Sequence, residues 1–174
     1  MTRRSIVLSA ALAIGVTGTA TLAYATAVFD GFVESVSEIC SEQPSTSCAF
    51  AVKNFLDADG DGFIAYDEVI AARDDARSSM KSQESKLDPQ ARGIVAVALL
   101  VTQDSQLPGV FNNFDTNGDS RLDEGELFAD FTLDERPFGD VMADPNGVNW
   151  QAFASRFGQA GILILGLLPA EYRQ

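Results

Sequence analysis

The chain has 174 residues, 46% of them hydrophobic, and 25 acidic against 12 basic residues give it a formal net charge of −13. This predicts one domain, with or without a targeting segment, and excludes a general nucleic-acid binder, because the acidic surface would repel phosphates. The chain has no histidine, which excludes Ser-His-Asp catalysis, Cys-His catalysis and His-ligated zinc. No other catalytic pattern is visible, so we do not expect an enzyme.

Residues 1–27 form a separate N-terminal element. A basic start with Arg3 and Arg4 precedes an apolar run over residues 6–25, and small-x-small cleavage sites lie within residues 23–27. The pattern predicts a signal peptide and export to the periplasm or the cell exterior. The alternative is an uncleaved membrane anchor with the domain outside the cytoplasm, since about twenty apolar residues can span a bilayer. The paired arginines leave the Sec and twin-arginine export routes both open.

Residues 28–48 predict an N-terminal helix and a polar loop. Apolar side chains recur at helical spacing from Val28 to Ile39, and polar residues follow. Cys40 and Cys48 bracket the loop. In an exported chain they favour a disulfide that ties this helix to the next one, whereas in the cytosol they would stay free thiols.

An acidic loop follows the helix expected over residues 49–56. Residues 57–68 read Asp-Ala-Asp-Gly-Asp-Gly-Phe-Ile-Ala-Tyr-Asp-Glu, with carboxylates at loop positions 1, 3, 5 and 12. Ca²⁺ takes about six to eight oxygen ligands, so a chain segment that binds it must curl around the ion. Gly62 at position 6 permits the positive φ of such a turn. The alternative is an acidic turn that binds nothing, but its carboxylates would then repel one another.

These residues resemble the loop of the EF-hand calcium-binding superfamily, down to Ile64 at position 8. The resemblance implies an all-α fold of helix–loop–helix units over residues 49–174, with Ca²⁺ as the cofactor. Water would take the place of a ligand at Ala65. The exiting helix would bury an apolar face that includes Val69 and Met80. The implied ligands are the side chains of Asp57, Asp59, Asp61 and Glu68 and the carbonyl oxygen of Phe63.

Residues 78–86 are polar and predict a linker, after which Asp88 and Pro89 predict a helix start. The run from Ile94 to Val101 is apolar all round. Since it is too short to cross a membrane, we expect a buried core helix.

A second loop of the same kind covers residues 115–126. Apolar spacing over residues 107–114 predicts its entering helix, and Leu127 and Phe131 suit its exiting helix. Ser120 replaces the glycine at position 6, and a non-glycine residue at positive φ costs about 1 kcal/mol. We expect both loops to bind, two ions in all. The implied ligands here are Asp115, Asn117, Asp119, Asp123 and Glu126, with the carbonyl oxygen of Arg121.

Residues 138–157 resemble a degenerate third hand. Its loop is shortened, and Ala152 stands where the bidentate Glu belongs, so we expect no ion there. EF-hands pair through a short bridge between their position-8 residues, and the sequence leaves open whether Leu122 pairs with Val148 or with Ile64. A set of hands of which some are silent is similar to calerythrin and the sarcoplasmic calcium-binding proteins.

The apolar tail over residues 162–169 predicts a segment that closes the core, with a docking tail for another protein as the alternative.

The purpose of calcium binding has two interpretations. In an exported protein Ca²⁺ is abundant, and permanently filled loops would stabilise the fold. Alternatively, the chain is a Ca²⁺-responsive adaptor or regulatory subunit that exposes an apolar groove to a protein partner. It would touch a membrane only through residues 6–25, if that segment is not cleaved. Calcium is the expected ligand in both cases.

Overall fold

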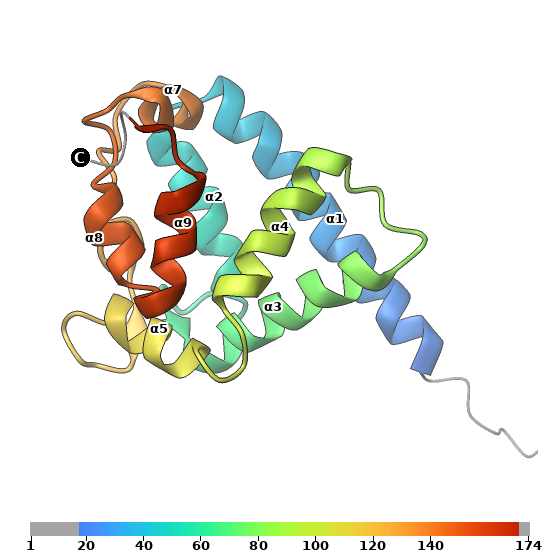
Figure 1. The fold of residues 1–174 in the computed structure, drawn as a ribbon. Helices are drawn as coiled ribbons and strands as arrows, with labels where there is room; N and C mark the ends of the chain where they lie inside the picture. The colour runs from blue at the N-terminus through green and yellow to red at the C-terminus, as the bar shows by residue number, and fades with distance from the viewer. Residues whose placement is uncertain (1–17, 171–174) are drawn as a thin grey trace, which may run out of the picture.

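The computed structural model describes the backbone of residues 18–170 and the side chains of residues 28–170. The chain is mostly helical (Figure 1), which confirms the expected all-α class. Two short strands, β1 (Ile64–Ala65) and β2 (Arg121–Leu122), form a two-stranded antiparallel sheet. The helices are α1 (Gly18–Glu42), α2 (Ser45–Leu56), α3 (Tyr66–Lys81), α4 (Pro89–Val101), α5 (Leu107–Phe114), α6 (Glu124–Leu127), α7 (Phe138–Ala143), α8 (Trp150–Ser155) and α9 (Gly161–Leu167), which follows the 3₁₀ turn η1 (Gly158–Ala160).

Helix α1 is longer than the sequence pattern predicts. It begins at Gly18, ten residues before the expected start at Val28, and runs without interruption to Glu42. The first 17 residues of the predicted signal peptide lie outside the described part of the chain, and cleavage of the segment stays a prediction. In the described residues, no helix has both the length and the apolar character that crossing a bilayer requires.

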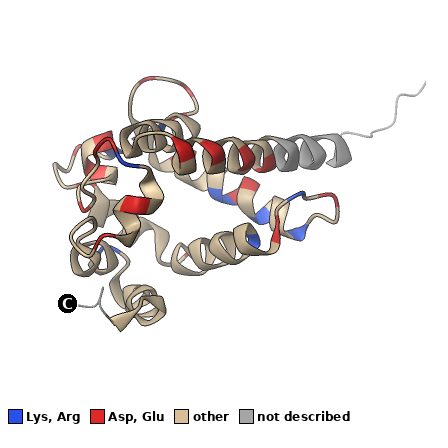
Figure 2. Cartoon of the chain, turned by 90° about the horizontal axis from the view of Figure 1, so that it is seen from above, with Lys and Arg blue, Asp and Glu red and all other residues tan. Residues whose placement is uncertain are grey.

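Helix α1 packs against α2 and α3. The rings of Phe32 on α1 and Phe55 on α2 stack with their centroids 3.8 Å apart. One buried carboxylate also joins α1 to the segment after α3, because Asp30 accepts hydrogen bonds from the hydroxyl of Ser79 and, at 2.7 Å, from the amide of Lys86. Acidic residues lie along α1 and near the loops, whereas α9 has none (Figure 2).

The prediction of a fully buried core helix over residues 94–101 is wrong. Helix α4 lies against α3 and buries Val95 and Val101. Ile94 is 65% exposed on its other side. Every position of this run is apolar, so the sequence does not show which face of the helix packs on the protein. In the structure only one face does.

Helix α9 covers the core in part. Leu165 and Leu168 pack against the buried cluster of Val141, Val148 and Trp150. Ile162, by contrast, is 73% exposed. The expected tail segment therefore closes one edge of the core and leaves an apolar face in solvent.

A disulfide between Cys40 and Cys48 joins the last turn of α1 to the first turn of α2, as the sequence predicts for an exported chain. The start of α2 is also held by the segment before α7, where the amide of Ser45 donates to the carbonyl oxygen of Arg136 at 2.7 Å. The hydroxyl of Ser45 donates to the carbonyl oxygen of Asp134 at 2.9 Å. The start of α2 is thus held to α1 by the disulfide and to residues 134–136 by hydrogen bonds.

Replacing Cys40 and Cys48 by serine is expected to lower the free energy of unfolding by about 2.5 kcal/mol, because a crosslink over a separation of 8 residues restricts the unfolded chain. Denaturant unfolding of the oxidised protein, the reduced protein and the double variant measures this difference. The reduced protein lacks the crosslink but keeps both cysteines, so it separates the effect of the crosslink from the effect of burying a serine at position 48. Equal stability of the oxidised and reduced forms would contradict the prediction.

Candidate metal centre

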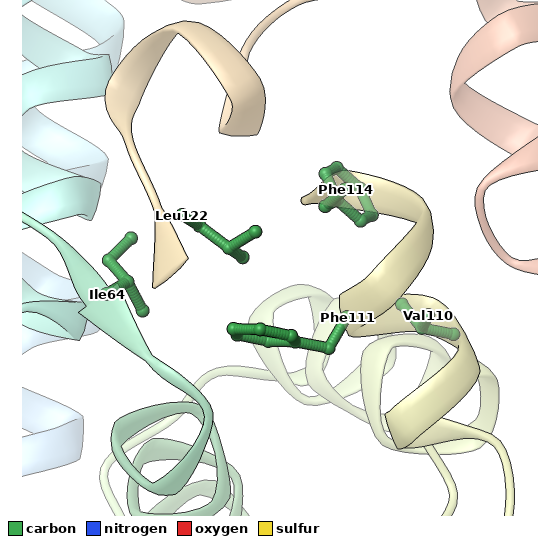
Figure 3. Packing of buried hydrophobic residues seen from close by; sticks show 5 residues of the cluster. All are labelled: Ile64, Val110, Phe111, Phe114 and Leu122. Carbon is green, nitrogen blue, oxygen red and sulfur yellow. The ribbon is translucent and has the colours of Figure 1, made fainter. Parts of the chain in front are cut away.

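The two acidic loops lie side by side, joined through their eighth residues. Strand β1 pairs with β2 so that Ile64 faces Leu122 and Ala65 faces Arg121. Ile64 and Leu122 are buried, and Figure 3 shows Leu122 extending toward Phe114 of α5, with the Phe111 ring directed at the two strands. The structure therefore pairs Ile64 with Leu122, one of the two arrangements that the sequence leaves open, and Val148 bridges Phe131 instead.

Each loop begins and ends at a helix. The first lies between α2, which ends at Leu56, and α3, which begins at Tyr66. The second lies between α5 and the short helix α6. Its exiting helix is shorter than predicted, since α6 ends at Leu127 and Phe131 lies in the bridge to Val148. Phe131 also packs on Phe153 of α8 with ring centroids 5.2 Å apart, so contacts with the C-terminal segments hold it outside a helix.

Three carboxylates of the first loop converge. Asp57, Asp59 and Asp61 each offer an oxygen, and these oxygens lie within 4.8 Å of one another. In the described part of the chain, this is the one group of three or more His, Cys, Asp or Glu side chains that could hold a metal ion.

Asp57 leaves one oxygen free at the base of the first loop. Its Oδ2 atom accepts hydrogen bonds of 3.0 Å from the amide of Gly62 and from the Lys53 ammonium. Its Oδ1 atom is buried and has no donor in full hydrogen-bond geometry, although the Gly60 amide also lowers the pKa of this carboxylate, and the side chain as a whole is 4% exposed. A buried oxygen without a donor costs free energy. A bound cation would satisfy it.

The surroundings of Asp57 favour its ionised form, the form that binds cations. The hydrogen bond from Lys53 lowers the pKa of Asp57 below its ordinary value; burial opposes this shift, and the Gly62 amide adds to it. Lys53 lies one helical turn before Asp57, so the pairing belongs to α2 itself. Lys53 is not among the residues predicted from the sequence, although its position four residues before Asp57 is a usable signal.

Glu68 lies across the first loop on backbone amides. Its Oε1 atom accepts from Ala58 at 2.7 Å and from Asp59 at 3.1 Å, and its Oε2 atom accepts from Ala65 at 2.7 Å. These amides belong to loop positions 2, 3 and 9. The structure therefore brings the three aspartates together and places Glu68 outside their group. Phe63 joins the loop through its amide, which donates to Asp61 at 2.9 Å.

Glu126 repeats this arrangement in the second loop. It accepts hydrogen bonds from the amides of Thr116, Asn117 and Asp123, again positions 2, 3 and 9. Burial raises the pKa of Glu126, but the hydrogen bonds from Asn117, Asp123 and Thr116 outweigh it, so the pKa lies below its ordinary value. The two loops thus share one backbone design.

The carboxylates of the second loop are more fully occupied by the backbone than those of the first. Asp115 accepts from Gly118 and Asp119 with one oxygen and from Ser120 with the other. Asn117 at position 3 supplies an amide oxygen in place of a carboxylate. It accepts from Asp119 at 2.8 Å, and Asp119 in turn accepts from Arg121 at 2.9 Å. Asp123 caps α6 through the amide of Glu126.

Positions 4 and 6 of both loops have positive φ. Gly60 and Gly118 have φ of 74°, Gly62 has φ of 96°, and Ser120 has φ of 69°. Ser120 is the one non-glycine residue with positive φ in the described chain. It therefore adopts the backbone conformation that the loop pattern predicts for it, at the expected conformational cost of about 1 kcal/mol.

Gly62→Ala is expected to destabilise the protein by about 1–2 kcal/mol, because a Cβ disfavours the backbone conformation of residue 62. A Cβ at this position would meet nothing within 4 Å, so the effect is conformational and not a clash. Gly93→Ala is the matched control, since Gly93 lies within α4 and also has open space around it. The free energy of unfolding of the Gly93→Ala control should rise by up to about 1 kcal/mol, because alanine favours a helix more than glycine does. Denaturant unfolding of both variants checks the opposite signs, and equal signs would contradict the assignment.

An arginine lies against the short loop that follows α7. The Arg136 guanidinium lies 2.8 Å from carboxylate oxygens of both Asp134 and Asp144. Arg136 lowers the pKa of Asp134; the Asn146 amide and then Arg136 lower the pKa of Asp144. At Gly147 a Cβ would come within 1.9 Å of the Val141 carbonyl oxygen. The short loop is therefore held by the Arg136 guanidinium and by close backbone packing at Gly147. The expected lack of an ion there stays a prediction.

Comparison of the chain with protein-family models, with curated proteins and with solved structures yields no match.

Proposed function

We propose that this chain is a Ca²⁺-binding protein with two EF-hand loops, in which the ions stabilise the fold. The observation that carries the proposal is the free, buried oxygen of Asp57 at the base of a cluster with Asp59 and Asp61. A shared cation would satisfy that oxygen and relieve the repulsion among the three carboxylates.

The donor atoms favour a hard cation. The two loops contain no histidine, cysteine or methionine, so their carboxylate, carbonyl and hydroxyl groups offer oxygen donors. Zinc and copper prefer nitrogen and sulfur ligands, whereas Ca²⁺ and Mg²⁺ prefer oxygen. A twelve-residue loop with many oxygens suits the larger and more flexible coordination of Ca²⁺.

Each loop would hold one ion. In the first loop, Asp57, Asp59 and Asp61 would bind through side chains, Phe63 through its carbonyl oxygen, and Glu68 after leaving the backbone amides. In the second loop, Asp115, Asn117, Asp119 and Glu126 would take the corresponding roles, with the carbonyl oxygen of Arg121. Asp123 would add a side-chain ligand at position 9, where the first loop has Ala65 and would use water. The shared pattern of hydrogen bonds to Glu68 and Glu126 supports equivalent roles for these two residues.

Stabilisation is the use that fits an exported protein. The disulfide is typical of oxidising compartments and supports export. At a free Ca²⁺ concentration of 100 times Kd, a site adds about 2.7 kcal/mol to stability if only the folded chain binds.

Calorimetric titration of the chelator-treated protein with Ca²⁺ tests the proposal. We expect two ions per chain, with Mg²⁺ binding more weakly. A titration without heat, together with an unchanged melting temperature, would contradict it.

A second candidate function is a Ca²⁺-responsive adaptor. The observation that favours it is an apolar groove of about 350 Å³ between α1, α2, α3 and α4, whose lining includes Phe29, Phe55 and Ile94. An amphipathic helix of a partner protein would suit such a groove. The adaptor requires that Ca²⁺ increase the binding of a hydrophobic dye, whereas structural stabilisation requires a decrease.

A further inference from the structure

Arg121 belongs to both loops. It occupies position 7 of the second loop, and the pairing of β1 with β2 sets it opposite Ala65 of the first hand. Its Nη1 atom lies 3.2 Å from the Oδ2 atom of Asp61. The guanidinium also lies over the Phe63 ring, 5.5 Å from the ring centroid. One side chain of the second loop is therefore fixed on two residues of the first.

The contact is one-sided. Phe63 occupies the same position in the first loop as Arg121 does in the second, but it has no charge to return across the strand pair. The second loop therefore places a positive charge on the first loop, and the first loop places none at the corresponding point of the second.

Two cations already share the acidic cluster of the first loop. Lys53 pairs with Asp57 on the buried side, and Arg121 pairs with Asp61 on the exposed side. Before an ion binds, these cations reduce the repulsion among the carboxylates. With an ion bound to Asp61, the Arg121 guanidinium would be a like charge paired with one of the ion's ligands, and like charges a few ångströms apart repel each other even in water.

We propose that Arg121 sets the Ca²⁺ affinity of the first loop by lowering it through its positive charge. The inference rests on the proposed function, since it assumes that Asp61 is a ligand. Arg121 is then an affinity-setting residue for the first loop through its side chain and a ligand of the second loop through its carbonyl oxygen.

The test compares Arg121→Gln with its parent in a Glu126→Gln background, which disables the second loop, and again with the second loop intact. Calorimetry should show a Ca²⁺ affinity of the first loop about three to ten times higher without the guanidinium, the range expected for exposed charges. Arg121→Lys, which keeps the charge, should bind as the parent does. The gain should shrink in 1 M KCl, because salt screens exposed charges.

Arg77→Gln is the matched control. It removes the same charge from the second half of α3, where Arg77 pairs with Asp74 and Asp104, and it should change the affinity less than twofold. Arg121 is 52% exposed, so its variant should fold, and melting in chelator verifies this. Unchanged or weaker binding by Arg121→Gln would overturn the inference and leave the proposed function standing. If the parent binds no Ca²⁺ in either background, both the inference and the proposed function are wrong.

Discussion

Glu68→Gln is expected to abolish one of two Ca²⁺ ions bound by the chain, and Glu126→Gln the other. Each glutamate would be the last oxygen donor of its loop, at position 12, where the loop pattern places a carboxylate that supplies both of its oxygens to the ion. Glutamine keeps the shape but removes the charge and one oxygen. Loss of a group that only supports a ligand costs about 10–100-fold in metal affinity, so loss of the ligand itself should cost at least about 100-fold. Calorimetric titration counts the remaining sites.

Neighbouring acidic residues provide the controls for charge. Asp67→Asn and Glu124→Gln each remove one exposed carboxylate from a loop position that is not an expected ligand, position 11 of the first loop and position 10 of the second, and both should retain two ions. Two ions in Glu68→Gln would show that Glu68 does not bind, and the same holds for Glu126→Gln. Three ions in the unmodified protein would show that the third hand binds as well.

Removal of Ca²⁺ is expected to lower the melting temperature by about 10–20 °C. Two sites at 100 times Kd contribute about 5.4 kcal/mol, and each kcal/mol shifts the melting temperature by about 2–4 °C in a chain of this length. Calorimetric melting in excess Ca²⁺ and in chelator measures the shift. The Glu68→Gln/Glu126→Gln double variant should show almost none, and an equal shift in that variant would place the binding elsewhere.

The change in melting temperature on removal of Ca²⁺ should also depend on pH. Asp57 and Glu126 have lowered pKa values in the folded chain. Their contribution to stability is therefore present above the unfolded-state pKa and is lost as the pH falls through the folded-state pKa. Protonation also removes the charge that binds Ca²⁺. The difference in melting temperature between Ca²⁺ and chelator should thus begin to shrink at about pH 4, where free carboxyl groups protonate, and should disappear only at lower pH, as the lowered pKa values of Asp57 and Glu126 are passed.

The features that could be predicted from the sequence are local ones. The boundaries of both loops, the positive φ at Ser120 and the disulfide are set by neighbouring residues. A loop ligand set is contiguous in the chain, so its spacing is visible without knowledge of the fold. The helical start at Asp88, whose side chain caps α4, is equally local.

The wrong predictions concern contacts between distant segments. Ile94 lies in an apolar run, but its exposure depends on which helices cover α4. Phe131 has the spacing of an exiting helix, yet it pairs with Val148. In each case the partners of the element decided its structure, and periodicity within the element does not identify partners.

The sequence by itself determined that the chain is helical and that two oxygen-rich loops, with glycine or serine at the turn, have the spacing of a cation site. Only the tertiary structure decided that Ile64 faces Leu122 and that Arg121 therefore reaches Asp61. The physical reason is the reach of the interactions. Turn conformation and ligand spacing depend on bonds within a dozen residues, whereas strand register depends on how segments far apart in the sequence bury their apolar side chains together.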